Sequence, residues 1–215
     1  MKKLLIFDLD GTLINTLFDL QSAVNYALKQ YDLPLRSIDQ VRQDIGNGVS
    51  KLMERSIPQE FQYLHPTLLK IFKEYYKNHY ADKTLPYEGM KETLLSLKDM
   101  GYHLGVVTNK FQDGATGLIN LFYEGIFEMV QGEVDYLKRK PDPEMVEKII
   151  DTLGYQKSES IYIGDTEVDY QTAYNSKIDV IMVTYGYRSK EFILDKLKDV
   201  PYVDTPNQLI DLLSK

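Results

Sequence analysis

No cysteine occurs anywhere among the 215 residues. Its absence excludes disulfide bonds, thiolate metal sites and cysteine nucleophiles together. A chain without disulfides suits the reducing cytoplasm, and we expect a cytoplasmic protein. Histidine is scarce too, and His65, His79 and His103 stand at no metal-ligand spacing. We expect each histidine to be a packed or exposed side chain.

Positive charge is in deficit, with 25 lysines and arginines against 32 acidic residues and a net charge of −7. Neither a nucleic acid nor an anionic membrane would be attracted to such a surface, so we expect neither as a partner. The N-terminal apolar run, Leu4 to Phe7, stops at Asp8 and is too short for a signal peptide or a membrane span. An anionic substrate would therefore need local positive charge or a metal.

Short apolar runs recur along the chain with helical stretches between them. They cover residues 4–7, 104–107, 161–163 and 180–183, with a weaker run at 127–130. Continuous rather than alternating runs are typical of strands that are covered on both faces of a parallel sheet. Apolar residues at helical spacing over 90–100 and 144–153 complete the pattern. The sequence therefore predicts an α/β fold with a Rossmann-like open parallel sheet.

Residues 15–82 interrupt this pattern with a stretch that is helical throughout. Apolar residues from Leu17 to Tyr31 share one helical face, as do those from Leu68 to His79, and Gly46 and Gly48 lie between them. Two capping-box starts are predicted, at Thr16 with Asp19 and at Ser37 with Gln40. We expect a helical cap domain at 15–82, inserted into a core domain of residues 1–14 and 83–215.

The segment Asp8-Leu9-Asp10-Gly11-Thr12 directly follows the first predicted strand. Ligands of open α/β sheets bind at the carboxyl ends of the strands, so both carboxylates would lie where a site belongs. One carboxylate can attack phosphorus while the other transfers protons. The alternative is an ordinary Asp-Gly turn after a strand.

Three more polar segments follow in order. Thr108-Asn109-Lys110, after the strand at 104–107, offers a cradle for phosphate oxygens, although such a pair also caps helices. Lys140 could pair with a phosphoryl group, or belong to a solvated basic run. Asp165 and Asp169 would face the same way on a helix. Oxygen ligands without histidine or cysteine select Mg²⁺, whereas acids at a helix start are also common.

In this order the four segments resemble the signature of the haloacid dehalogenase superfamily, which runs Asp-x-Asp-Gly-Thr, then Thr or Ser, then Lys, then Gly-Asp-x-x-x-Asp. Within it the chain is similar to phosphoglycolate phosphatase-like proteins, through Ile45 to Gly48, Pro86 to Met90 and Tyr185 to Tyr187. The resemblance implies a haloacid dehalogenase-like core with an inserted cap. Asn15 is a departure, because many relatives carry an acidic residue there.

The resemblance implies a Mg²⁺-dependent phosphatase, a phosphoric monoester hydrolase, acting on a small-molecule phosphate ester. Asp8 would be the nucleophile and form an aspartyl-phosphate, while Asp10 would protonate the leaving group and then activate water. The implied phosphate-binding residues are Thr108, Asn109 and Lys140. The implied metal site consists of the Asp8 carboxylate, the Asp10 backbone carbonyl and Asp165, with Asp169 orienting bound water.

Several alternatives stay open. A β-phosphoglucomutase-like sugar phosphomutase would use the same intermediate, and pyrophosphatases and nucleotidases share the superfamily. A non-catalytic phosphate-binding module fits less well, because adjacent carboxylates repel its ligand. A phosphonate hydrolase would need a cap lysine, and Lys51 fits a solvent-facing helix position better. The natural substrate and the oligomeric state are not readable from the sequence.

Overall fold

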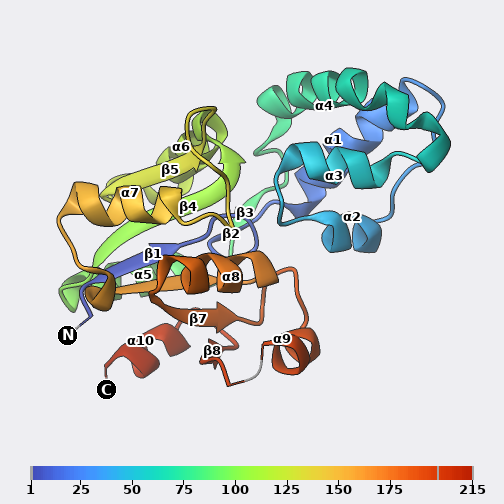
Figure 1. The fold of residues 1–215 in the computed structure, drawn as a ribbon. Helices are drawn as coiled ribbons and strands as arrows, with labels where there is room; N and C mark the ends of the chain where they lie inside the picture. Colours follow the sequence, from blue (N-terminus) through green and yellow to red (C-terminus); the bar gives the residue numbers. More distant parts are fainter. Residues whose placement is uncertain (1, 198, 215) are drawn as a thin grey trace. The chain divides into compact units, whose positions relative to one another are not determined.

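The computed structural model describes residues 2–197 and 199–214 and divides the chain into two compact units (Figure 1). The first unit consists of Met1–Ile14 and Pro86–Lys215, and the second of Asn15–Leu85. The chain passes from one to the other at β2 (Ile14–Asn15) and β3 (Leu85–Pro86), two short strands that pair with each other. That the second unit acts as a cap stays a prediction.

A six-stranded parallel sheet in the order β5-β4-β1-β6-β7-β8 forms the centre of the first unit. The predicted α/β fold is thereby confirmed, and every predicted apolar run contributes to a strand. The sixth strand has only two residues and no apolar run to reveal it. The strands are β1 (Leu4–Phe7), β4 (His103–Phe111), β5 (Met129–Glu133), β6 (Ser160–Gly164), β7 (Asp179–Val183) and β8 (Tyr202–Val203).

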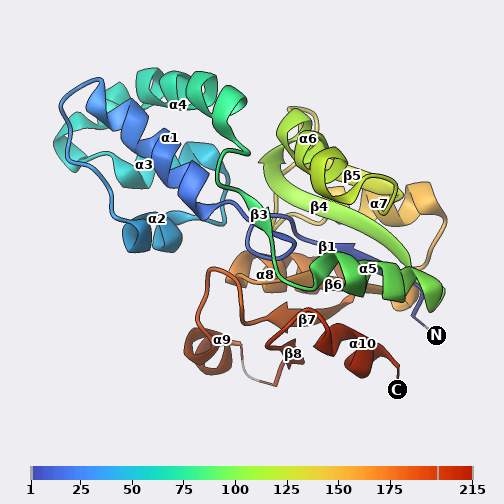
Figure 2. The same cartoon turned by 180° about the vertical axis from the view of Figure 1, so that it is seen from behind.

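Helices cover both faces of this sheet, as the two opposite views show (Figures 1 and 2). On one face lie α7 (Glu144–Leu153) and α8 (Glu167–Ser176), and on the other α5 (Met90–Asp99) and α6 (Gln112–Tyr123). The unit also contains η2 (Lys157–Glu159), α9 (Lys190–Lys196) and α10 (Gln208–Leu213). Both helices predicted by spacing, at 90–100 and 144–153, are present.

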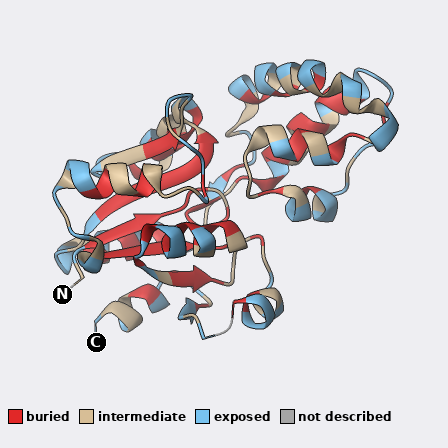
Figure 3. Ribbon diagram, viewed as in Figure 1, coloured by how far each residue is buried: buried red, intermediate tan, exposed pale blue. Residues whose placement is uncertain are grey.

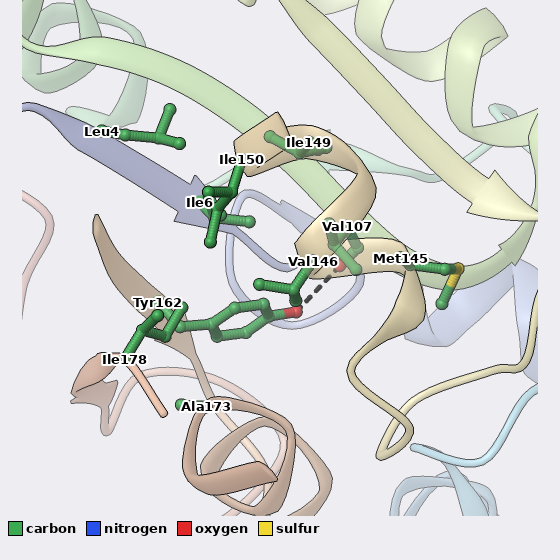
Figure 4. Close-up of a cluster of buried hydrophobic side chains, with 10 residues drawn as sticks. All are labelled: Leu4, Ile6, Val107, Met145, Val146, Ile149, Ile150, Tyr162, Ala173 and Ile178. Carbon is green, nitrogen blue, oxygen red and sulfur yellow. Dashed lines mark hydrogen bonds between the residues drawn. The ribbon is translucent and has the colours of Figure 1, made fainter. Parts of the chain in front are cut away.

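The core of the first unit is packed around β1, all four residues of which are buried (Figure 3). Leu4 and Ile6 belong to one buried cluster with Val146 and other residues of α7 (Figure 4). Tyr162 of β6 is part of this cluster, and its hydroxyl donates a hydrogen bond of 2.9 Å to the backbone carbonyl of Val107 (Figure 4). This buried cluster therefore includes a polar group, the Tyr162 hydroxyl.

The second unit is helical, as predicted. It contains α1 (Leu17–Lys29), α2 (Ile38–Asp44), α3 (Val49–Ser56), η1 (Gln59–Leu64) and α4 (His65–His79). Ser37 and Gln40 form the predicted capping box at the start of α2. Leu68, Phe72 and Tyr76 are the buried residues of α4, which is the amphipathic helix that the spacing indicated.

Two details of the cap prediction are wrong. Thr16 makes no side-chain cap at the start of α1, and the Asp19 carboxylate accepts hydrogen bonds from the backbone of Lys83 and Thr84. Tyr31 lies beyond the end of α1 and is 42% exposed, so it is not part of the buried helical face. Across residues 2–197 and 199–214, no helix combines the length and the apolarity that crossing a bilayer requires.

Candidate active site

Side chains from three segments of the first unit meet beyond the carboxyl end of β1. Carboxylate oxygens of Asp8, Asp165 and Asp169 all lie within 4.8 Å of one another, and all three residues are buried. Asp8 directly follows β1, Asp165 directly follows β6, and Asp169 lies in the first turn of α8. Adjacent parallel strands thus bring together residues that are more than 150 positions apart.

The ammonium of Lys140 lies among these carboxylates. Its Nζ is 2.8 Å from Asp8 Oδ1 and 2.7 Å from Asp169 Oδ1, and it donates to the hydroxyl of Tyr162 at 2.9 Å. A lysine ammonium has three protons to donate, and here three acceptors surround it. Because the Tyr162 hydroxyl donates its own hydrogen bond to the backbone carbonyl of Val107, Lys140 is fixed against the sheet.

Asp165 is held by neutral donors. Its Oδ1 accepts a hydrogen bond of 3.1 Å from the Thr12 hydroxyl, and its Oδ2 accepts one of 2.8 Å from the backbone N–H of Tyr187. Two glycines leave room for it: a Cβ on Gly11 or on Gly186 would lie 2.4 Å from atoms of the Asp165 side chain. Gly11 also has φ of +92°, which disfavours other residues.

Asp169 has two functions in the structure. Its Oδ1 pairs with Lys140, while its Oδ2 accepts hydrogen bonds from the backbone N–H and the hydroxyl of Thr166, which form a capping box at the start of α8. The acid-rich helix start and the gathering of charged groups, which the sequence presented as alternatives, are therefore both present.

Burial and the charges of neighbouring carboxylates raise the pKa of Asp8 and of Asp165. Burial and the Asp169 carboxylate raise the pKa of Asp8 to about 7, although Lys140 opposes this shift. Burial and the charges of Asp169 and Asp8 likewise raise the pKa of Asp165 well above its usual range. For Lys140, burial alone would lower the pKa, but the carboxylates of Asp169 and Asp8 outweigh it and the pKa lies well above the ordinary value.

The donor set fits a hard divalent cation. The clustered ligand atoms are all carboxylate oxygens, as Mg²⁺ prefers, with no histidine or cysteine among them. Among the described side chains, Asp8 Oδ1 is one of the few buried polar atoms with no hydrogen bond of good geometry, despite the Lys140 ammonium nearby. A cation would offset the charge that Lys140 leaves uncompensated.

The second polar segment lies at the end of β4. Thr108 is buried, and its hydroxyl accepts a hydrogen bond from the backbone N–H of Lys110. The Asn109 side chain makes two hydrogen bonds with the backbone of Lys140, donating to its carbonyl at 3.0 Å and accepting from its N–H at 2.9 Å. The structure thus uses Asn109 to position Lys140, and a contact with phosphate stays a prediction. Asp10 forms an ion pair with Lys110.

Sequence reasoning missed four contributors to this site: Thr12, Lys110, Tyr162 and Tyr187. Each belongs to a segment that the sequence analysis names, but the predicted roles there were given to neighbouring residues. Tyr162 was counted only as part of an apolar run, yet a tyrosine in a fully buried run usually needs a partner for its hydroxyl. Thr12 lies in a turn, Tyr187 in a bend and Lys110 in β4; all three reach the site through contacts with distant segments that a sequence pattern does not specify.

Lys51 and the three histidines have the surroundings that the sequence predicts, a solvent-facing helix position for the lysine and packed or exposed positions for the histidines. Lys51 is exposed on α3 and forms an ion pair of 2.7 Å with Glu54. His79 and His103 are partly exposed and pair with acidic side chains, and His65 is partly buried against a backbone carbonyl. The predictions for these four residues are confirmed.

Comparisons with known proteins agree with this geometry. The model of a family described as haloacid dehalogenase-like hydrolase matches residues 5–183. A phosphoglycolate phosphatase of Caulobacter vibrioides is 33% identical over 97% of this chain and 91% of its own length. One from Mesorhizobium japonicum is 30% identical over 88% of this chain and 86% of its own length.

A solved structure is similar over nearly the whole chain. It comes from Lactobacillus delbrueckii subsp. bulgaricus and is described as that of a proposed phosphoglycolate phosphatase. Its TM-score is 0.93 at 33% sequence identity, with 99% of each chain covered. The similarity therefore includes the sheet, the helices around it and the inserted helical unit.

Proposed function

This chain belongs to the haloacid dehalogenase-like hydrolase family and is a phosphoric monoester hydrolase, and on that basis we propose that it is a Mg²⁺-dependent phosphatase that works through an aspartyl-phosphate on Asp8. The observation that carries the proposal is the Lys140 ammonium, which lies within 2.8 Å of both Asp8 and Asp169. The names of the relatives support phosphoglycolate as the substrate. A cytoplasmic location stays an expectation from the lack of cysteine.

In this proposal the Asp8 carboxylate, the Asp10 backbone carbonyl and Asp165 hold Mg²⁺, and Asp169 orients a bound water. When bound, the cation supplies positive charge that stabilises the negative charge of the transferring phosphoryl group. The buried carboxylate oxygens within 4.8 Å of one another support this assignment.

Nucleophilic attack, proton transfer and phosphate binding are assigned to different residues. Asp8 attacks phosphorus in line, and the bond from phosphorus to the leaving oxygen breaks as the aspartyl-phosphate forms. Asp10 gives a proton to the leaving oxygen and later takes one from the attacking water, which is worth about 10² to 10⁴ in rate. Lys140 and Thr108, with Asn109, hold the phosphoryl oxygens. The buried ammonium offsets the repulsion between the carboxylates and the phosphoryl group.

The test is phosphate release from phosphoglycolate, pyrophosphate, a nucleoside monophosphate and a hexose 1-phosphate, with Mg²⁺ and with EDTA. We expect phosphoglycolate to be hydrolysed in Mg²⁺ only, and Asp8→Asn to reduce the rate to background. A matched control is Asp39→Asn, which changes a 73% exposed carboxylate that pairs with Arg42 and should leave the rate unchanged. Isomerisation of the hexose 1-phosphate without phosphate release would indicate a phosphomutase. Turnover that persists in Asp8→Asn would exclude Asp8 as the nucleophile.

A further inference from the structure

Lys110 is a second buried lysine beside the site, and the mechanism above does not use it. It belongs to the last part of β4, and its side chain is 1% exposed. Its Nζ lies 3.1 Å from one carboxylate oxygen of Asp10 and 3.5 Å from the other. Lysines are rarely this buried, because removing an ammonium from water costs several kcal/mol unless anions compensate. The Asp10 carboxylate is one such anion, and it links this buried ammonium to the proposed chemistry.

We propose that Lys110 binds an anionic group on the leaving part of the substrate and thereby selects phosphate compounds whose leaving group carries its own negative charge near the bridging oxygen. The inference rests on the proposed function, because it takes Asp10 as the residue that protonates that oxygen.

Distance supports this assignment. To give up its proton, Asp10 must approach the bridging oxygen to within one hydrogen-bond length. Lys110 is one ion-pair length from Asp10, so its ammonium lies at most about 6 Å from the bridging oxygen. An anionic group attached one or two atoms beyond that oxygen can fill the gap between the oxygen and the ammonium.

The distribution of charge supports it too. Lys140 is already engaged with Asp8, Asp169 and the Tyr162 hydroxyl, and in the proposed function it also holds the phosphoryl group, so a second anion on the substrate needs another cation. A substrate anion that arrives next to Asp10 would be repelled by its carboxylate and by that of Asp8. Lys110 offsets this repulsion on the leaving-group side, where the structure places it against Asp10.

Two kinds of substrate have this chemistry. In phosphoglycolate a carboxylate stands one carbon from the bridging oxygen, and in pyrophosphate the second phosphate is attached to it directly. Hydroxyethyl phosphate has nearly the shape of phosphoglycolate but carries a hydroxyl in place of the carboxylate. It therefore isolates the contribution of the second charge.

The experiment measures kcat and KM for these three compounds in Mg²⁺, with the wild type and with Lys110→Met. A charge-assisted hydrogen bond to an anion predicts that kcat/KM for phosphoglycolate, divided by that for hydroxyethyl phosphate, falls about 10- to 150-fold. Because this is a ratio within one protein sample, it does not depend on how much of the variant is folded. A matching fall for pyrophosphate would show that any anion serves, and a fall confined to phosphoglycolate would assign the carboxylate.

Lys190→Met is the matched control. Lys190 forms a comparable pair with Asp204, at 2.8 Å in the same unit, but it is 40% exposed, and the substrate ratio should not change. If Lys110→Met does not fold, Lys110→Gln provides the same neutral change with a polar side chain. An equal loss for all three compounds would overturn the proposal, since Lys110 would then act only through Asp10. Failure of the proposed function would be distinct, because the wild type would release no phosphate from any of them.

Discussion

Lys140 compensates only part of the negative charge in the site. It pairs with Asp8 and Asp169, whereas Asp165 accepts hydrogen bonds from the neutral donors Thr12 and Tyr187 and forms no ion pair within the described part of the chain. Asp165 is also fully buried, and a buried carboxylate without a counter-charge destabilises the folded state. In the proposed function this uncompensated carboxylate is also a ligand of the metal.

We therefore expect Asp165→Asn to abolish hydrolysis and yet stabilise the metal-free protein. The pKa of Asp165 is raised in the folded state, so its destabilising effect is absent below pH 4 and grows as the pH rises toward the folded pKa. The gain in the free energy of unfolding should be about 1 kcal/mol at pH 8 and smaller at pH 5. Urea denaturation in EDTA at both pH values measures it.

Asp169→Asn provides the contrast in the same assay. It removes one of the two carboxylate partners of the buried Lys140 ammonium, so we expect a loss of about 3 kcal/mol in the free energy of unfolding. If both variants changed stability in the same direction, uncompensated charge at Asp165 would not be the cause.

At the scale of elements, the sequence predicts the strands and helices that a local pattern of apolar residues specifies. The apolar runs at 4–7 and 161–163 form β1 and β6. A strand that is covered on both faces of a sheet has no solvent-facing side, so a continuous apolar run predicts it. Asp8 and Asp165 then meet because β1 and β6 are parallel neighbours, and the carboxyl ends of parallel strands lie at the same edge of the sheet. The candidate site was predictable to this extent.

What could not be predicted depends on contacts between distant segments. Nothing local to Asp19 indicates that it binds the backbone near residue 83, and a capping box with Thr16 was the better prediction from neighbouring residues. Likewise, the partner of the Tyr162 hydroxyl is on another strand, 55 residues away. Tertiary hydrogen bonds override local propensities at both positions.

The hydrogen bonds of Asp19 fasten the two ends of the helical unit to each other. Its carboxylate is 1% exposed and accepts from the backbone N–H groups of Lys83 and Thr84 and from the Thr84 hydroxyl. Asp19→Ala would leave these buried donors without partners, and we expect a loss of about 3 kcal/mol in the free energy of unfolding of this unit.

Guanidinium denaturation followed by the fluorescence of its tyrosines measures this loss. Asp39→Ala changes an exposed carboxylate on α2 and should shift stability by no more than about 0.5 kcal/mol. Equal effects of the two substitutions would mean that Asp19 is not a fastening residue.

At the scale of the whole molecule, the proposed chemistry lies within one of the two units. All the predicted site residues, from Asp8 to Asp169, belong to the first unit, and the second contributes a separate buried set on its helices. Each unit has its own core, so a ligand that binds one of them need not stabilise the other. Substrate selection by the second unit stays a prediction.

Hydrogen exchange with and without Mg²⁺ tests this division. A cation that binds only the folded first unit stabilises it by about 2.7 kcal/mol at a concentration one hundred times its Kd. We therefore expect slower exchange in β6 and α8, whose ends carry Asp165 and Asp169, and unchanged exchange in α4 of the second unit. Asp8→Asn should weaken the effect, because it removes one of the proposed ligands. If α4 gained as much protection as α8, the two units would unfold as one, and the second would share in the energetics of metal binding.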